Sequence, residues 1–364
     1  MRRDDPAHMT DTIRISVDAM GGDKGPRVAI HGSLLELKER KNTSFIFHGR
    51  EAELAPILDE FPKLKAVSRI VHSDNVITMD DKPSAALRKG RGNSSMWAAL
   101  ESVRDGEADV VVSGGNTGAL MAMATFCLRP MEGISRPAIA ALWPTLRTDI
   151  IVLDVGATVG GDARQLVDFS ILGSAMARAL FDQEAPSVGL LNVGTEEMKG
   201  HDEVKEAARA LAVASGAGFV YHGFVEGDDI GKGTVDVVVT EGFTGNIALK
   251  TAEGTARQLG SYMRGAFKAD PLSQLGAFIA GQAIEALRRK LDPRNINGGV
   301  FLGLNGIVIK SHGGTDEIGF KAALSLAYEM ARSRLIDKIG EGMRRFPARA
   351  IEPVVTPEPE KKPA

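Results

Sequence analysis

The chain has 364 residues, of which 43% are hydrophobic and 25% are charged, and its formal net charge is -3. A nearly neutral chain with only 5% aromatic residues has neither the basic field nor the stacking side chains that nucleic-acid-binding proteins use. Its one cysteine, Cys127, excludes a disulfide within the chain and argues against a zinc cluster.

The two ends of the chain differ in composition from the rest. Residues 1–11 are polar and lack the apolar segment of a secretory signal, so we expect a flexible N-terminus. Residues 347–364 are rich in proline, glutamate and lysine, which predicts a disordered tail. No apolar run reaches the about 18 residues of a membrane span. We therefore expect a cytoplasmic protein with a single α/β domain at 12–346.

Apolar strands alternate with helices along most of the chain. In the first part we predict strands at 13–20, 44–49, 66–72 and 109–115 and helices at 26–40, 51–60 and 117–129. Next come strands at 138–144, 149–156, 187–194 and 235–242, an apolar segment at 218–225, and helices at 163–181, 202–214 and 244–262. Continuous apolar strands between helices are typical of a mostly parallel sheet covered on both faces. The predicted fold is a three-layer α/β fold.

Residues 255–293 break this alternation. Asp270-Pro271 is typical of a helix start, and apolar residues recur at helical spacing on both sides of it. We predict a helical hairpin, inserted before core strands at 301–314 and a final helix at 317–343. The apolar stripe of the hairpin favours a dimer interface or core. With its flanking arginines and lysines, it is also suited to an anionic membrane surface.

Glycine-rich turns follow five of the strands, at 18–23, 113–119, 154–162, 241–246 and 305–316. Glycine lets backbone N–H groups approach an anion closely, and a helix N-terminus adds partial positive charge. Tight strand-to-helix turns also need glycine for structural reasons. Because ligands bind at the carboxyl ends of parallel strands, we expect the five turns on one edge of the sheet to hold a phosphate-rich ligand.

Other chemical motifs are weak or missing. The chain has no Walker motif and no dinucleotide fingerprint, and its histidines lack ligand spacing, so we expect no cofactor and no metal. His312 and Asp316 form an HxxxD pair, which suits acyl transfer or a structural histidine. Residues 73–100 carry Lys82, Arg88, Lys89 and Arg91, which are either a solvated surface or cations for phosphate or an acidic carrier protein.

Taken together, the motifs resemble a known family. DAMGGD at 18–23, SGGNTGAL at 113–120, the segment at 190–200, VVVTEGFTGNIALKTAEG at 237–254 and LGLNGIVIKSHG at 303–313 are similar to the acyl-ACP:phosphate acyltransferases of phospholipid synthesis. The resemblance covers roughly residues 13–345. It implies a fold like that of isocitrate dehydrogenase and phosphotransacetylase. It also implies transfer of a long-chain acyl group from acyl carrier protein to inorganic phosphate, giving acyl phosphate for phosphatidic acid synthesis.

The resemblance further implies a homodimer formed through the hairpin, peripheral membrane association, and delivery of the product to a membrane glycerol-3-phosphate acyltransferase. Lys199 and Asn246 match functional positions of the family, and we add His312 as a possible donor to the leaving sulfur. The residues expected to bind phosphate or substrate are Asp18, Gly21, Gly22, Ser113, Gly114, Gly115, Asn116, Thr117, Gly118, Gly245, Asn305 and Gly306. The chain departs from the family at Thr158, which puts a direct role of that residue in doubt.

Three other functions stay open. A phosphotransacetylase would use coenzyme A as the thiol. A metal- and NADP-dependent decarboxylating dehydrogenase would need clustered aspartates, which the sequence does not suggest. A membrane scaffold without catalysis would be supported by the hairpin alone and would leave the five turns unexplained.

Overall fold

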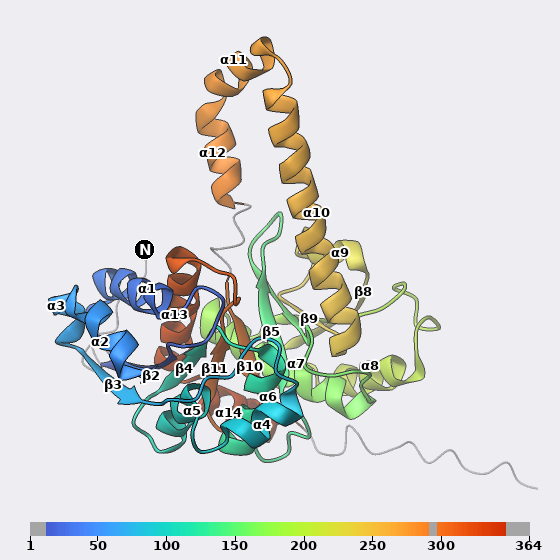
Figure 1. The fold of residues 1–364 in the computed structure, drawn as a ribbon. Helices are drawn as coiled ribbons and strands as arrows, with labels where there is room; N and C mark the ends of the chain where they lie inside the picture. The colour runs from blue at the N-terminus through green and yellow to red at the C-terminus, as the bar shows by residue number, and fades with distance from the viewer. Residues whose placement is uncertain (1–11, 291–296, 347–364) are drawn as a thin grey trace, which may run out of the picture.

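The computed structural model describes residues 12–290 and 297–346, so the predicted flexible N-terminus and disordered tail lie outside the described residues. One eleven-stranded sheet crosses the molecule (Figure 1), in the order β3-β2-β1-β4-β11-β10-β5-β6-β9-β7-β8. Its strands are β1 (Ile13–Asp18), β2 (Thr43–Gly49), β3 (Ser68–His72), β4 (Val110–Ser113), β5 (Ala138–Trp143), β6 (Ile150–Leu153), β7 (Ser187–Leu191), β8 (Val220–Val225), β9 (Val237–Val239), β10 (Gly299–Leu302) and β11 (Ile307–Lys310).

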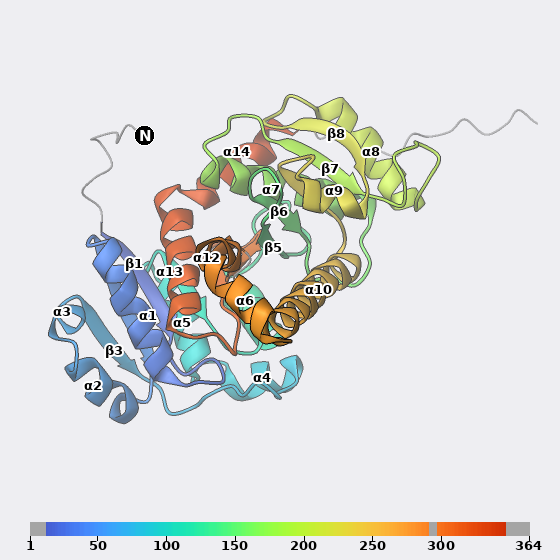
Figure 2. The same cartoon turned by 90° about the horizontal axis from the view of Figure 1, so that it is seen from above.

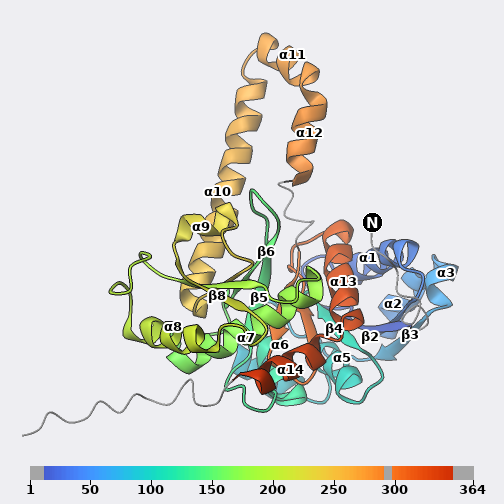
Figure 3. The ribbon, with the colours of Figure 1, turned by 180° about the vertical axis from the view of Figure 1, so that it is seen from behind.

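Helices cover both faces of this sheet, which confirms the predicted three layers. Side chains of a strand alternate between faces, so Val110 and Val112 enter one hydrophobic core and Val111 enters the other. The first core is covered by α1 (Pro26–Glu39), α2 (Glu51–Asp59), α3 (Pro62–Lys65), α7 (Ala163–Leu180), α8 (Asp202–Ala214), α13 (Glu317–Arg332) and α14 (Leu335–Arg345). Figure 3 shows several of these from behind. The second core is covered by α4 (Pro83–Gly90), α5 (Ser95–Arg104), α6 (Thr117–Leu128), α9 (Gly227–Lys232) and the start of α10 (Gly242–Lys268).

Strand direction corrects one expectation. β5 and β10 are antiparallel to both of their neighbours, so β6, β7, β8 and β9 run opposite to β1, β2, β3, β4 and β11 along the ladder. The five turns therefore do not share one edge. Those following β1, β4 and β11 belong to the first half of the sheet, and those following β6 and β9 belong to the second. Sheets generally twist by about 20° per strand pair, and Figure 2 shows the two halves of this sheet from above.

The hairpin is a continuation of a core helix. We predicted a helix at 244–262 and an overlapping hairpin at 255–293. The structure joins the two, because α10 runs without a break into the first arm of the hairpin and ends at Lys268, and α11 (Pro271–Ile279) and α12 (Gly281–Lys290) follow it. Asp270 caps α11 as expected, because its side chain accepts a hydrogen bond from the Ser273 N–H at 2.9 Å. The hairpin projects from the body (Figure 1). Its apolar side chains are exposed, Phe278 by 84%.

Two further points concern the helices. The predicted final helix is two helices, α13 and α14, because the chain turns at Arg334, whose φ of 55° is outside the helical range. Among the helices of the described residues, none is both long and apolar enough to span a bilayer.

The buried histidine of β2 gives a testable acid sensitivity. Burial, with the nearby charge of Arg69, lowers the pKa of His48 to about 3. The unfolded chain takes up a proton there below about pH 6.5 and the folded protein does not, so unfolding becomes easier as pH falls. Between pH 6.5 and 5 we expect His48 to lower the free energy of unfolding by about 2 kcal/mol. Urea unfolding across this range should show a shallower pH slope for His48→Gln; parallel slopes would contradict the assignment.

Candidate active site

The carboxylate of Asp18 lies at the end of β1, where it joins three elements. Ser113, at the end of β4, donates its hydroxyl to Asp18 Oδ2 at 2.7 Å, and Ser95, at the start of α5, donates to Asp18 Oδ1 at 2.8 Å. Asp18 is only 1% exposed. Burial raises its pKa, although the two serine hydroxyls and the charge of Lys310 oppose that rise. Asp18 and Ser113, both predicted site residues, are thus in direct contact.

The three turns of the first half of the sheet pack against one another through glycines. A Cβ added to Gly21 would lie 2.7 Å from the Gly115 nitrogen, and one added to Gly114 would lie 3.1 Å from the Gly21 carbonyl oxygen. The third turn joins them because the Asp23 N–H donates to the Gly313 carbonyl at 2.9 Å. Larger residues at Gly21 or Gly114 would separate the turns. The structure therefore brings together the predicted residues of 18–23 and 113–118.

Lys310 belongs to this site, although it is not among the residues predicted from the sequence. It is the last residue of β11, opposite Ser113 in the ladder. Its ammonium group donates to the carbonyls of Gly114, at 3.4 Å, and Ser311. Burial lowers its pKa to about 8, with the carboxylates of Asp18 and Asp23 acting in the opposite direction. A half-buried cation therefore stands at the junction of the three turns.

The end of β11 is fixed by Asn297, which was also missed. This buried side chain donates to Ser311 Oγ and to the Gly319 carbonyl, both at 2.8 Å, and accepts from the His312 N–H at 2.9 Å. Its polar atoms thereby link the β11 end to the start of α13. Asn297 precedes Gly298 and Gly299, a pair that lies outside the five turns predicted to bind the ligand. We assign it a positioning role for Lys310 and His312.

Backbone N–H groups are available at this junction. Asn116 caps α6 through its side-chain oxygen, which accepts from the Ala119 N–H at 2.9 Å. Within the described residues, the N–H groups of Thr117 and Gly118 have no protein acceptor, and Thr117 is exposed. A small hollow of about 10 Å³ lies beside the turns. It is lined by Gly21, Gly22, Lys24, Gly114, His312 and Gly313, among others. Free amides beside a half-buried cation are suited to an oxyanion.

The turns of the second half are built differently, because side-chain carboxylates already occupy their amides. Asp154 accepts hydrogen bonds from the N–H groups of Gly156, Ala157 and Thr158. Glu241 accepts from the N–H groups that open α10 and from Gly160. These two turns therefore bind the protein's own anions, and they leave little room for a phosphate. Their tight geometry holds the start of α10.

Thr158, Gly245 and Asn246 lie in or beside the two turns of the second half of the sheet. Thr158 is buried, and its hydroxyl accepts from the Gly242 N–H at 3.0 Å, which gives it a structural role. A Cβ on Gly245 would overlap the carbonyl oxygen of Asp154, so this glycine permits close packing of α10. Asn246 is exposed on α10, next to Gly156. Its amide has no hydrogen-bond partner within the described residues.

Lys199 lies apart from these groups. It follows β7 on an exposed loop that is closed by Asn192, whose amide donates to the Lys199 carbonyl at 3.0 Å. Its ammonium group pairs with Glu196 at 2.9 Å, and this hydrogen bond raises the pKa of Lys199. None of its contacts within the described residues reaches the turn at 113–118.

Asn305 and Gly306 lie at the other end of β11 from Ser311. The Asn305 amide donates to the carbonyls of Arg129 and Pro130, at 3.0 and 2.9 Å, so it braces a loop. The structure does not bring these two predicted residues to the three-turn junction. It does bring His312 there, where His312 Nδ1 accepts from the Gly314 N–H at 3.3 Å.

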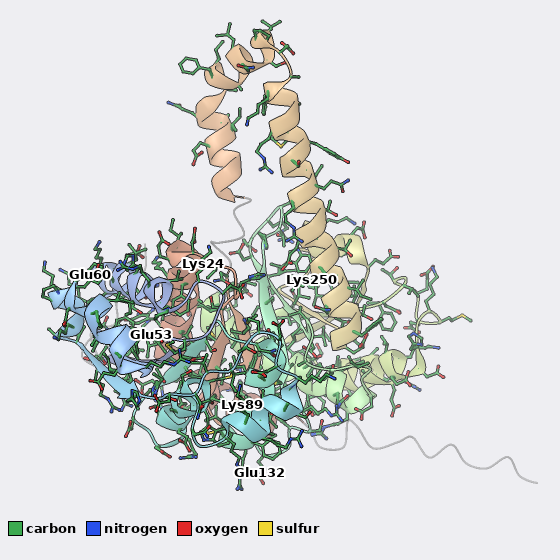
Figure 4. The ribbon with its side chains drawn as sticks, viewed as in Figure 1. Lys24, Glu53, Glu60, Lys89, Glu132 and Lys250 are labelled. Atoms are coloured by element: carbon green, nitrogen blue, oxygen red, sulfur yellow. The ribbon has the colours of Figure 1, made fainter. Side chains whose placement is uncertain are left out.

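Lys250, on α10, links the second half of the sheet to this junction. Its charge acts on Lys310 and contributes to the lowered pKa of Lys310. Figure 4 labels Lys250 and Lys24, and Lys24 is one of the residues that line the hollow. Within the described residues, no group of three or more histidine, cysteine or acidic side chains is arranged to hold a metal ion.

Comparisons with known proteins support this fold. A sequence profile of the family described as "Fatty acid synthesis protein" matches residues 13–338. The chain is 60% identical over 337 residues to the phosphate acyltransferase of Chelativorans sp. (strain BNC1), covering 93% of this chain and 96% of that protein. It is 61% identical over 335 residues to the phosphate acyltransferase of Xanthobacter autotrophicus, covering 92% of this chain and 94% of that protein.

Among solved structures, a phosphotransacetylase from Streptococcus pyogenes superposes with a TM-score of 0.61 at 16% identity, covering 91% of this chain and 96% of that one. A phosphotransacetylase from Staphylococcus aureus gives 0.58 at 17% identity, covering 88% and 94%. At such low identity the similarity concerns the fold alone. The two superpositions confirm the predicted phosphotransacetylase-like architecture.

Proposed function

Because the chain belongs to the phosphate acyltransferase family, we propose that it transfers a long-chain acyl group from acyl carrier protein to inorganic phosphate. The product is an acyl phosphate for phosphatidic acid synthesis. The observation that carries this proposal is the junction of three glycine turns around Lys310, with free backbone amides beside a half-buried cation. An inorganic oxyanion is the ligand that such a junction suits best.

The transfer of an acyl group from a thioester to phosphate does not require a strong general base. A phosphate oxygen forms a bond to the thioester carbonyl carbon, the carbon–sulfur bond breaks, and the carrier thiolate leaves and takes up a proton. Phosphate is already anionic at neutral pH, and a thiol with a pKa of about 8.5 is a good leaving group. The protein must orient two reactants and stabilise charge at the tetrahedral carbon.

Residues of the junction and of the start of α10 divide these tasks. Lys310 and the N–H groups of Thr117 and Gly118 hold phosphate. The unpartnered amide of Asn246 polarises the thioester carbonyl, and His312 protonates the leaving sulfur. Lys199, on its exposed loop, is a further cation for the anionic substrate rather than part of the phosphate junction.

The hairpin serves assembly and location in this proposal. One part of its exposed apolar surface forms the contact between two copies of the chain. Another part, with Leu272, Leu275 and Phe278, forms the contact with an anionic membrane surface. A protein held in this way at the cytoplasmic face delivers its reactive product to a membrane glycerol-3-phosphate acyltransferase.

The test is phosphate-dependent release of thiol from palmitoyl carrier protein, with detection of the acyl phosphate by mass. We expect turnover that saturates with phosphate and needs no added metal or nucleotide. Efficient use of acetyl-coenzyme A without use of the carrier substrate would instead favour a phosphotransacetylase. Absence of turnover with either thioester would contradict the proposal and leave the scaffold role.

A further inference from the structure

The helix α4 carries a basic surface that the proposed chemistry does not use. We define the α4 surface as Lys82, Arg88, Lys89 and Arg91, all of which are exposed. Ala86 and Leu87, on the same helix, pack into the second hydrophobic core, so the cations face outward. This concentration of positive charge occurs in a chain whose formal net charge is -3.

These cations have few anionic partners of their own. Lys89 lies 3.9 Å from Asp81, which is at the limit of an ion pair. Within the described residues, no carboxylate pairs with Lys82, Arg88 or Arg91. Arg91 instead lies over the rings of Trp97 and Phe126, at 5.8 and 5.9 Å from their centroids. Surface cations left unpaired and held in place are available to an external anionic partner.

The α4 surface is attached directly to the candidate active site. The Asn116 amide donates to the carbonyls of Met79, at 2.6 Å, and Asp81, at 3.0 Å. A Cβ on Gly118 would lie 2.7 Å from the ring of Pro83, the first residue of α4. A partner bound on α4 is therefore next to the turn that offers free amides to phosphate.

We propose that the α4 surface docks the acyl carrier protein through an acidic helix of that carrier, an inference that rests on the proposed function. Acyl carrier proteins are small acidic proteins that present the acyl group on a flexible arm. Charge complementarity favours α4, and its contact with the 113–118 turn lets the arm enter the site. Figure 4 labels Lys89 on the body of the molecule, away from the projecting hairpin, so carrier docking and membrane contact use different surfaces.

The experiment compares two thioesters with the full-length protein. Charge reversal in Arg88→Glu/Lys89→Glu should raise the KM for palmitoyl carrier protein at least about tenfold. The rate with palmitoyl-pantetheine, which lacks the acidic protein, should stay within about twofold. The KM of the wild-type protein for the carrier should rise with salt, since exposed charges are screened, and the variant should lose most of this dependence. Lys82→Glu tests the same surface from the other end of α4.

The matched control is Lys38→Glu/Lys41→Glu, which makes the same charge change on exposed residues at the far end of α1. It should leave both KM values unchanged. If the α4 variants keep the wild-type KM for the carrier, or lose both substrates equally, the docking proposal is wrong. If the α4 variants lose binding to anionic vesicles but keep the wild-type KM for the carrier, the docking proposal is also wrong, and the α4 surface instead contacts a membrane. A wild-type protein that uses palmitoyl-pantetheine but not the carrier would refute both the donor and its docking.

Discussion

Replacing Lys310 with methionine should lower kcat/KM for phosphate about 100-fold. Methionine is unbranched like lysine and removes only the charge and its hydrogen bonds. Loss of one preorganised group that stabilises an anion typically costs about 3 kcal/mol, or about 100-fold. The measurement is initial rate against phosphate concentration at a saturating thioester concentration. Lys38→Met, on an exposed turn of α1, is the control and should behave as wild type.

The pH dependence gives a second test of Lys310. Its pKa is lowered by burial to about 8, so the ammonium group is charged below this pH and neutral above it. If the charge holds phosphate, kcat/KM for phosphate should fall as pH rises through about 8. Lys310→Arg should abolish this fall, because arginine stays protonated. A methionine variant with wild-type kinetics, or an arginine variant with the same alkaline fall, would exclude Lys310 from phosphate binding.

The convergence of the three turns of the first half of the sheet was largely predictable from the sequence. Apolar strands followed by glycine-rich turns predicted ligand binding at strand ends, and Gly21, Gly114 and Ser113 do meet there. Strand direction was not predictable. β5 and β10 are short buried strands, and their apolar pattern would be the same with parallel or antiparallel neighbours. The sequence therefore predicted all five turns at one edge of the sheet, whereas the structure divides them between its two halves.

The identity of the central cation was also hidden from sequence reasoning. Lys199 follows a strand and matches a family position, but it lies on an exposed loop and pairs with Glu196. Lys310 is one apparently ordinary lysine in the sequence. Its chemistry comes from burial and from Asp18, which folding brings near it from the other end of the chain. The sequence of a glycine-rich turn also does not show whether its backbone N–H groups are free. In the turn after β6 they already donate hydrogen bonds to the Asp154 carboxylate.

The largest effect on stability is expected at Gly245. A Cβ there would overlap the Asp154 carbonyl oxygen, and that carbonyl belongs to a turn fixed by several hydrogen bonds. We expect Gly245→Ala to lower the free energy of unfolding by about 3 kcal/mol, the upper part of the range for overpacking. Urea unfolding followed by circular dichroism gives this value.

Gly254, on the same helix, provides the control, because a Cβ there would meet nothing within 4 Å. Gly254→Ala should be neutral or stabilising by up to about 1 kcal/mol, since alanine favours a helix more than glycine does. The pair also separates two roles for Gly245. If this residue lines a phosphate site, its alanine variant will keep the wild-type unfolding curve and lose affinity for phosphate. If Gly245 instead permits α10 to pack against the Asp154 turn, the free energy of unfolding will fall. Activity will then fall only because Asn246 and Lys250, which lie on α10, are displaced.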